Sequence, residues 1–152
     1  MITAEKGEQI AAAAKAWIGT PHMNNAKVKG KGVDCAMLMV GALEDAGIMP
    51  ENAVRVKPYS TEWHLHRSEE RLLEQVRAYC QEVPAEDMHP GDFLLYQYGR
   101  CVSHAGVYCG NGVVCHALIE HGVVLTDIDD VMFCDARGRS RLARASARAW
   151  RG

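Results

Sequence analysis

Three residues of the sequence have side chains suited to covalent acyl-transfer chemistry. Cys35 follows Asp34 at the expected start of a helix, and His104 and His116 lie in two later segments with a strand pattern. A cysteine nucleophile needs a base that takes its proton, and the base needs a third group that fixes its tautomer and tilt. One cysteine and two histidines can supply these three functions if the fold brings them together.

The position of Cys35 matters because a helix N-terminus carries partial positive charge and unpaired backbone N–H groups. Both features favour the thiolate and are expected to lower the pKa of the thiol. The same N–H groups, with that of Ala36 foremost, can bind the oxyanion of a tetrahedral intermediate, and Asp34 fits the N-cap acceptor position. The alternative is a small buried cysteine behind an ordinary helix cap, and this feature alone favours that alternative.

The two histidines flank the turn Gly110-Asn111-Gly112. If the turn is symmetric about Asn111, Gly106 faces His116, and His104 is the diagonal neighbour of His116 on the same face. Gly106 then leaves the space between the two rings empty of side chain. A two-residue turn would instead place the histidines on opposite faces, and two satisfied histidines on a half-buried sheet remain an alternative.

The elements around these residues suggest an α+β fold with helices first and an antiparallel sheet later. Apolar spacing, caps and stop signals predict helices over residues 4–17, 35–46 and 69–80. Short apolar runs between glycine-bearing turns predict strands over residues 92–98, 102–109, 113–118 and 123–126. Residues 24–33 are polar and glycine-rich and predict a loop. The tail, residues 137–152, carries six arginines and is expected to be a short helix or a mobile end.

Five segments together resemble one family, the NlpC-type cell-wall endopeptidases, which are papain-like cysteine peptidases. The segments, in chain order, are Trp17–Pro21, Gly32–Cys35, Pro90–Asp92, Ser103–Tyr108 and Cys115–Ala117. Residues 54–75 look similar to the branch of this family found in phage and prophage tail gene clusters and in gene transfer agents. The resemblance extends from about residue 5 to residue 133, and the ordered set of motifs is much more specific than Asp-Cys alone.

This resemblance implies a single papain-like domain over residues 1–136, with the nucleophile helix packed on an antiparallel sheet. It implies Cys35 as nucleophile, His104 as base and His116 as the orienting residue. It also implies hydrolysis of an amide in peptidoglycan stem peptides, typically next to D-glutamate and a diamino acid, without a cofactor.

Two positions depart from the family pattern. His22 stands where many members have a tyrosine whose hydroxyl reaches the active site, although an imidazole can still donate a hydrogen bond there. Met37 stands where many members have glycine, and its bulk can narrow the cleft. Neither departure removes a member of the triad. The sequence thus makes His22, Asp34 and Ala36 candidate substrate or oxyanion residues.

Composition limits the partners and the location. The formal net charge of -2 argues against nucleic acid, and there is no apolar run long enough for a membrane span. The N-terminal residues do not read as a signal peptide, so we expect cytoplasmic synthesis, reduced cysteines and incorporation into a phage tail or phage-like particle. Possible partners are tail or baseplate proteins, onto which the arginine-rich tail could dock.

Other functions compete with the hydrolase. A structural tail component could keep the fold without the chemistry, and an acyltransferase or another amidase could use the same triad. His64 and His66 share a face of an extended segment, but the sequence offers no convincing further ligand for a metal. Asp127, Asp129 and Asp130 lack the spacing of a calcium loop. No metal site is therefore expected.

Overall fold

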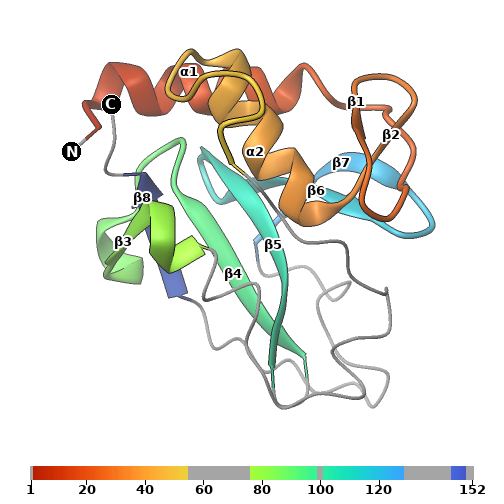
Figure 1. The fold of residues 1–152 in the computed structure, drawn as a ribbon. Coiled ribbons are helices and arrows are strands. Elements are labelled where there is room, and N and C mark those ends of the chain that lie inside the picture. The colour runs from red at the N-terminus through yellow and green to blue at the C-terminus, as the bar shows by residue number, and fades with distance from the viewer. Residues whose placement is uncertain (1, 55–75, 99–100, 129–144, 150–152) are drawn as a thin grey trace.

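The structure, a computed structural model, describes residues 2–54, 76–98, 101–128 and 145–149 (Figure 1). Helix α1, Ala4–Lys15, begins after Thr3, whose hydroxyl accepts a hydrogen bond from the backbone N–H of Lys6. Its buried side turns Ile10 and Ala14 into the core. The predicted helix over residues 4–17 is therefore confirmed to within two residues, with Thr3 as its N-cap.

Helix α2, Cys35–Asp45, follows a small hairpin made of β1, Lys27–Val28, and β2, Gly32–Val33. This hairpin lies within residues 24–33, for which a loop was predicted. Asp34 caps α2 by accepting a hydrogen bond of 2.9 Å from the backbone N–H of Met37. The helix is apolar on nearly all sides and buried along most of its length. Such a helix belongs inside the domain, so its first residue is held rigidly.

Six strands form one sheet in the order β3-β8-β4-β5-β6-β7, and every pairing is antiparallel. The strands are β3, Cys80–Val83, β4, Phe93–Tyr98, β5, Cys101–Gly110, β6, Val113–Leu118, β7, Gly122–Asp127, and β8, Ala145–Ala149, with a short 3-10 helix, η1, over Ala85–Asp87. The four strands predicted from the sequence correspond to β4 to β7. The α+β fold class with an antiparallel sheet is confirmed.

The core lies between the helices and one face of the sheet, and Figure 1 shows α1 and α2 on the same side of the strands. Alternation along β4 sends Phe93 and Leu95 into this core, whereas Leu94 and Tyr96 belong to a second buried cluster. Trp17 packs on Gly41 of α2, where an added Cβ would come within 2.5 Å of the indole ring. Its indole N–H donates to Asp45 over 2.9 Å, which joins the two helices.

One sequence expectation about elements is confirmed in part and another is wrong. Of the helix predicted over about residues 69–80, residues 76–79 are helical, residues 69–75 lie outside the described part, and Cys80 already belongs to strand β3. The tail was expected to be a helix or a mobile end, but Ala145–Ala149 form β8 between β3 and β4. Its pairing partners are far away in the sequence.

Candidate active site

Cys35 is the first residue of α2 and is half-buried. Backbone N–H groups of Ala105, Ala36 and Cys35 itself lie against the thiol and favour its ionised form. Burial, helped by the nearby Asp34 carboxylate, outweighs them and raises the pKa of the Cys35 thiol to about 12. The expectation of a lowered pKa is therefore wrong for this structure, and at neutral pH Cys35 rests as a thiol.

The contact with Ala105 places the thiol beside the strand that carries His104. His104, in β5, is 7% exposed, and His116, in β6, is fully buried. Nε2 of His104 and Nδ1 of His116 are 2.9 Å apart, and the two rings meet edge to face with their centroids 5.1 Å apart. The structure thus joins the two histidines in one hydrogen bond inside the protein.

The register of the β5–β6 hairpin produces this contact. Val107 pairs with Cys115, so Gly106 lies opposite His116 and His104 is its diagonal neighbour. A Cβ on Gly106 would lie 2.9 Å from the Cβ of His116 and 2.5 Å from the side chain of Val114. The predicted facing of Gly106 and His116 is confirmed, but the turn is not symmetric about Asn111: Gly110 pairs with Val113, and a register shift between Tyr108 and Gly110 restores the facing. Any side chain at position 106 would have to displace its neighbours.

The electrostatics keep His104 neutral at rest. Burial, together with the neighbouring imidazoles of His116 and His22, lowers the pKa of His104 to about 3. When His104 donates from Nε2 to His116, its Nδ1 carries the lone pair that can accept the proton of a thiol. A neutral thiol and a neutral imidazole can then exchange a proton without a change in net charge.

His22 lies at the edge of this arrangement. It forms an isolated parallel bridge with Val33. It lies close enough to His104 to lower the pKa of that histidine, and close enough to Asp34 to interact with its carboxylate. Burial lowers the pKa of His22, while Asp34 raises it. A half-buried neutral imidazole at this position can donate one hydrogen bond.

Asp34 connects the helix start to the loop that carries His22. One carboxylate oxygen accepts from Met37, and the other accepts from the backbone N–H of Asn25 over 2.6 Å. The predicted N-cap is thus confirmed. A carboxylate accepts and does not donate, so Asp34 cannot itself bind an oxyanion; it caps the helix start where the backbone N–H of Ala36 lies against the Cys35 thiol.

One neighbour of the histidines was not predicted from the sequence. The hydroxyl oxygen of Thr126, in β7, lies 2.8 Å from Nε2 of His116. No motif marks this threonine, because only the register between β6 and β7 brings it to the ring. Its role is taken up below.

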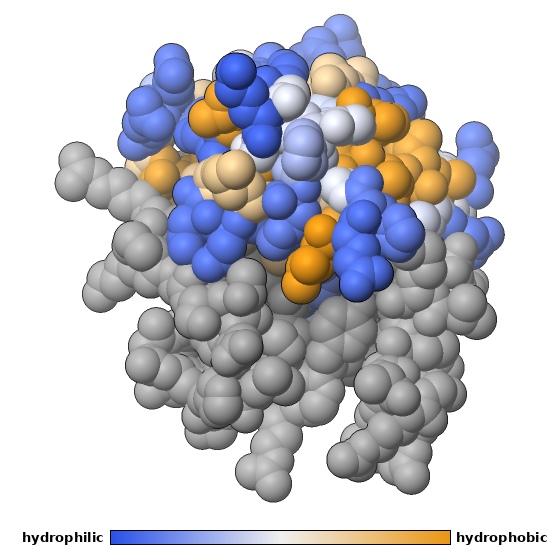
Figure 2. All heavy atoms as spheres, turned by 90° about the vertical axis from the view of Figure 1, so that its right-hand side faces the viewer, coloured by the Kyte–Doolittle hydropathy of each residue, from blue (hydrophilic) through white to orange (hydrophobic). Residues whose placement is uncertain are grey.

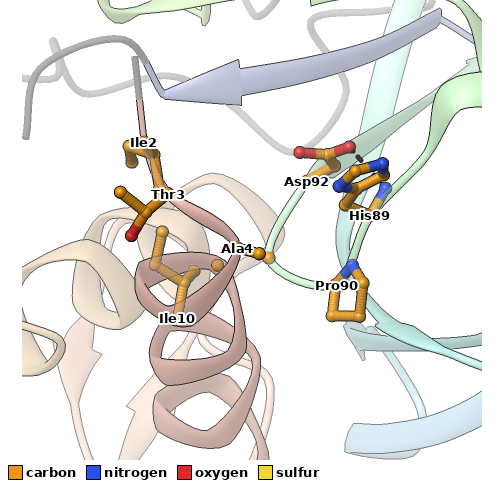
Figure 3. Close-up of a pocket in the computed structure, with 9 residues that line it drawn as sticks. Ile2, Thr3, Ala4, Ile10, His89, Pro90 and Asp92 are labelled. Atoms are coloured by element: carbon orange, nitrogen blue, oxygen red, sulfur yellow. Dashed lines mark hydrogen bonds between the residues drawn. The ribbon is translucent and has the colours of Figure 1, made fainter.

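A pocket of about 160 Å³ lies elsewhere, between the first turn of α1 and the turn before β4 (Figure 3). Its lining includes Ile2, Ile10, His89, Pro90 and Asp92, and none of the candidate site residues. Asp92 is already bonded to the backbone N–H of His89 over 2.8 Å. This hollow is therefore not part of the candidate active site.

The described residues contain no group of three His, Cys, Asp or Glu side chains that could hold a metal ion. His64 and His66, which the sequence analysis considered as ligands, lie outside the described residues, as do Asp129 and Asp130. Among the described helices, none has the length and apolar character needed to cross a membrane.

Comparison with known proteins identifies the family. The model of the NlpC/P60 family matches residues 17–139, which is most of the chain and includes all three candidate catalytic residues. The chain belongs to the NlpC/P60 family. The probable endopeptidase Rv2190c of Mycobacterium tuberculosis H37Rv is 29% identical over 108 residues, covering 71% of this chain. The chain spans only 22% of the length of that relative.

Solved structures place this NlpC/P60 chain in the papain-like α+β fold of the family. The NlpC/p60 domain of the peptidoglycan hydrolase SagA superposes with a TM-score of 0.61 at 16% identity, covering 94% of this chain and 97% of that domain. RipD of M. tuberculosis, described as a non-catalytic NlpC/p60 domain protein adapted to peptidoglycan binding, has a TM-score of 0.53 at 14% identity, covering 82% of this chain and 89% of that one. At such identities these likenesses establish the fold alone.

The lowered pKa of His104 predicts a stability that depends on pH. Between pH 6.5 and about 3 the unfolded chain binds a proton at this histidine that the folded chain does not. The free energy of unfolding therefore falls as pH falls through this window, by up to about 1.4 kcal/mol per pH unit. We expect the drop in Tm between about pH 7.5 and about pH 4.5 to be smaller for His104→Gln than for the parent. The control His121→Gln changes an exposed turn residue and should behave like the parent; equal drops in all three proteins would contradict the prediction.

Proposed function

We propose that this chain is a cysteine peptidase that hydrolyses amide bonds in the stem peptides of peptidoglycan. The observation that carries the proposal is the buried 2.9 Å hydrogen bond between His104 and His116. The next residue of β5, Ala105, has its backbone N–H against the Cys35 thiol. A nucleophile, a base and an orienting group are thereby assembled by three elements, α2, β5 and β6. Burial keeps competing water away from the pair.

The reaction proceeds by covalent catalysis. His104 takes the thiol proton at Nδ1 while the sulfur of Cys35 attacks the carbonyl carbon of the substrate amide. The oxyanion accepts hydrogen bonds from backbone N–H groups at the start of α2, with His22 as a further donor. His104 returns the proton to the leaving amine as the C–N bond breaks and leaves an acyl thioester. Water, deprotonated by His104, then releases the acid and restores the thiol.

His116 supports each proton transfer. Its Nδ1 accepts from Nε2–H of His104, so the positive charge that forms on His104 is stabilised by a hydrogen bond that is already in place. A water molecule would have to reorient to do the same. His116 therefore holds the base in the productive tautomer throughout the cycle.

The substrate class is supported by the family and by the surface beside the site. Large apolar side chains are exposed in two segments of the chain. Two backbone hydrogen bonds join these segments, because Gly19 donates to the carbonyl of Val123 and Val123 donates to the carbonyl of Thr20. The exposed residues are Ile18, Met23, Val28, Ile119 and Leu125. Figure 2, which views the side of the molecule with β1, β2 and β7, shows apolar areas broken up by polar ones. Such a mixed surface suits a chain of short peptide and sugar units, and the family resemblance favours the bond between D-glutamate and a diamino acid.

The sequence resemblance of residues 54–75 adds a narrower proposal, that the hydrolase is carried on a phage tail or a phage-like particle and opens the cell wall for it. These residues lie outside the described part of the chain. The competing proposal is a tail component of the same fold that binds without cutting. The intact Cys35, His104 and His116 favour catalysis.

The test is incubation of the purified chain with stem-peptide fragments of defined sequence, followed by mass analysis of the products. Hydrolysis predicts two products whose masses add up to the substrate plus one water, with the cut at a single amide. Fragments with another diamino acid in the third position test the specificity. Binding of the fragments without any product would favour the structural alternative.

A further inference from the structure

We infer that Thr126 is a positioning residue that keeps His116 able to accept the hydrogen bond of His104. The inference rests on the proposed function, because it assigns a role within the same triad. It starts from the 2.8 Å contact between the Thr126 hydroxyl and Nε2 of His116.

The contact repeats the geometry of the histidine pair on the next strand. Val114 pairs with Thr126 and His116 pairs with Val124, so Thr126 is the diagonal neighbour of His116 on the same face of the sheet. His104, His116 and Thr126 thus lie on three adjacent strands, one diagonal step apart, and are joined by bonds of 2.9 Å and 2.8 Å. A threonine that merely filled space would not need its hydroxyl directed at the outer ring nitrogen.

Proton positions along this chain are linked. A neutral imidazole has one N–H, so His116 can accept at Nδ1 only if its proton is on Nε2. That Nε2–H is fully buried and needs an acceptor, and the Thr126 oxygen is at hydrogen-bond distance from it. If His116 carried its proton on Nδ1 instead, it would donate to Nε2 of His104. The proton of His104 would then be on its Nδ1, which is the nitrogen that must accept the proton of Cys35.

The hydroxyl matters most during the reaction. Once His104 has taken the thiol proton, both of its nitrogens carry protons, and its Nε2 can only donate to His116. His116 must then donate from Nε2, and Thr126 must accept. A side chain that cannot accept removes this hydrogen bond from His116 at the moment when charge develops on His104.

The decisive variant is Thr126→Val, because valine keeps the volume and the β-branch but has no hydroxyl. We expect kcat to fall by a factor of about 10 to 100 with little change in KM, since the lost bond supports the transition state and not substrate binding. Thr126→Ser restores the hydroxyl and should recover most of the rate. Asp127→Asn, at the exposed neighbouring position of β7, is the control for disturbance of the strand and should leave kcat unchanged.

A second readout does not require hydrolysis. Nitrogen-15 NMR of the histidine rings reports which nitrogen of His116 is protonated. The parent should show protonated Nε2 and unprotonated Nδ1, and Thr126→Val should shift the population toward the other tautomer.

Protonated Nδ1 in the parent, or a folded Thr126→Val with parental kcat and parental ring signals, would overturn the inference. So would a folded Thr126→Ser that is as impaired as valine. If the parent hydrolyses no stem peptide, the proposed function fails, while the ring signals still decide the role of Thr126.

Discussion

Replacing Cys35 with alanine is expected to reduce hydrolysis of a stem peptide by a factor on the order of 10³ or more, because the residual rate comes only from substrate binding and oxyanion donors. The reason is chemical, since alanine has no atom that can attack the carbonyl carbon. The fold should remain, because Cys35 is a half-buried first residue of α2 and alanine is a good helix former. The measurement is the initial rate of product formation beside a thermal melt.

The matched control is Cys109→Ala. Cys109 is also a half-buried free cysteine, and its thiol donates to the backbone carbonyl of Val107 over 3.4 Å. Its removal should leave the rate within about a factor of two of the parent, as expected for a weak donor with no part in the proposed reaction. A Cys35→Ala protein that kept its activity, or a Cys109→Ala protein that lost it while remaining folded, would show that the nucleophile has been assigned wrongly.

The site illustrates what the sequence can and cannot predict. Local chemistry determines the cap of α2 and the turn between β5 and β6, so Asp34 and the facing of Gly106 and His116 could be predicted from neighbouring residues. The turn itself has positive φ at Gly110, Asn111 and Gly112, which are residue types that tolerate this conformation. Each of these features depends on residues fewer than about fifteen positions apart.

Features that depend on distant packing were missed. The helix N-terminus does act to lower the pKa of Cys35, but burial of the thiol, which only the tertiary structure reveals, has the larger effect and the opposite sign. The contact between Thr126 and His116 depends on the register between β6 and β7, which no sequence motif specifies. Strand β8 has alanine at most positions, so it carries no hydrophobic pattern that could have marked it as a strand, and it pairs with residues fifty or more positions away.

The position of β8 predicts a large loss of stability when the chain is shortened. A chain ending at Arg144 lacks β8 and therefore loses four residue pairs with β3 and three with β4. Seven residue pairs of antiparallel strands correspond to about seven hydrogen bonds, and at a net 0.5–1.5 kcal/mol each the free energy of unfolding falls by roughly 4–10 kcal/mol. A domain of this kind has a total of about 5–15 kcal/mol, so the shortened protein should melt far below the parent or fail to fold.

The loss should also change how the protein associates. Without β8, the edge of β4 at Phe93–Leu95 no longer has its partner, and an unpaired edge is a template for pairing with another chain. We therefore expect the shortened protein to aggregate, as measured by light scattering during a thermal melt. A chain ending at Ala149 keeps β8 and is the matched control, which should melt like the parent.

A single substitution separates the strand from the mere length of the tail. Ala147 pairs with Glu82 on one side and with Phe93 on the other, so Ala147→Pro removes a backbone donor from the middle of the sheet without shortening the chain. It should reproduce most of the loss, whereas Arg148→Ala, a change of side chain alone at the neighbouring position, should not. The opposite result would be that the full-length Ala147→Pro protein and the protein that ends at Arg144 both melt like the parent. It would show that β8 contributes little to stability. Because β4 continues directly to Tyr96, the partner of His104 on β5, loss of stability at this edge should also reduce hydrolysis even though β8 contributes no residue to the site.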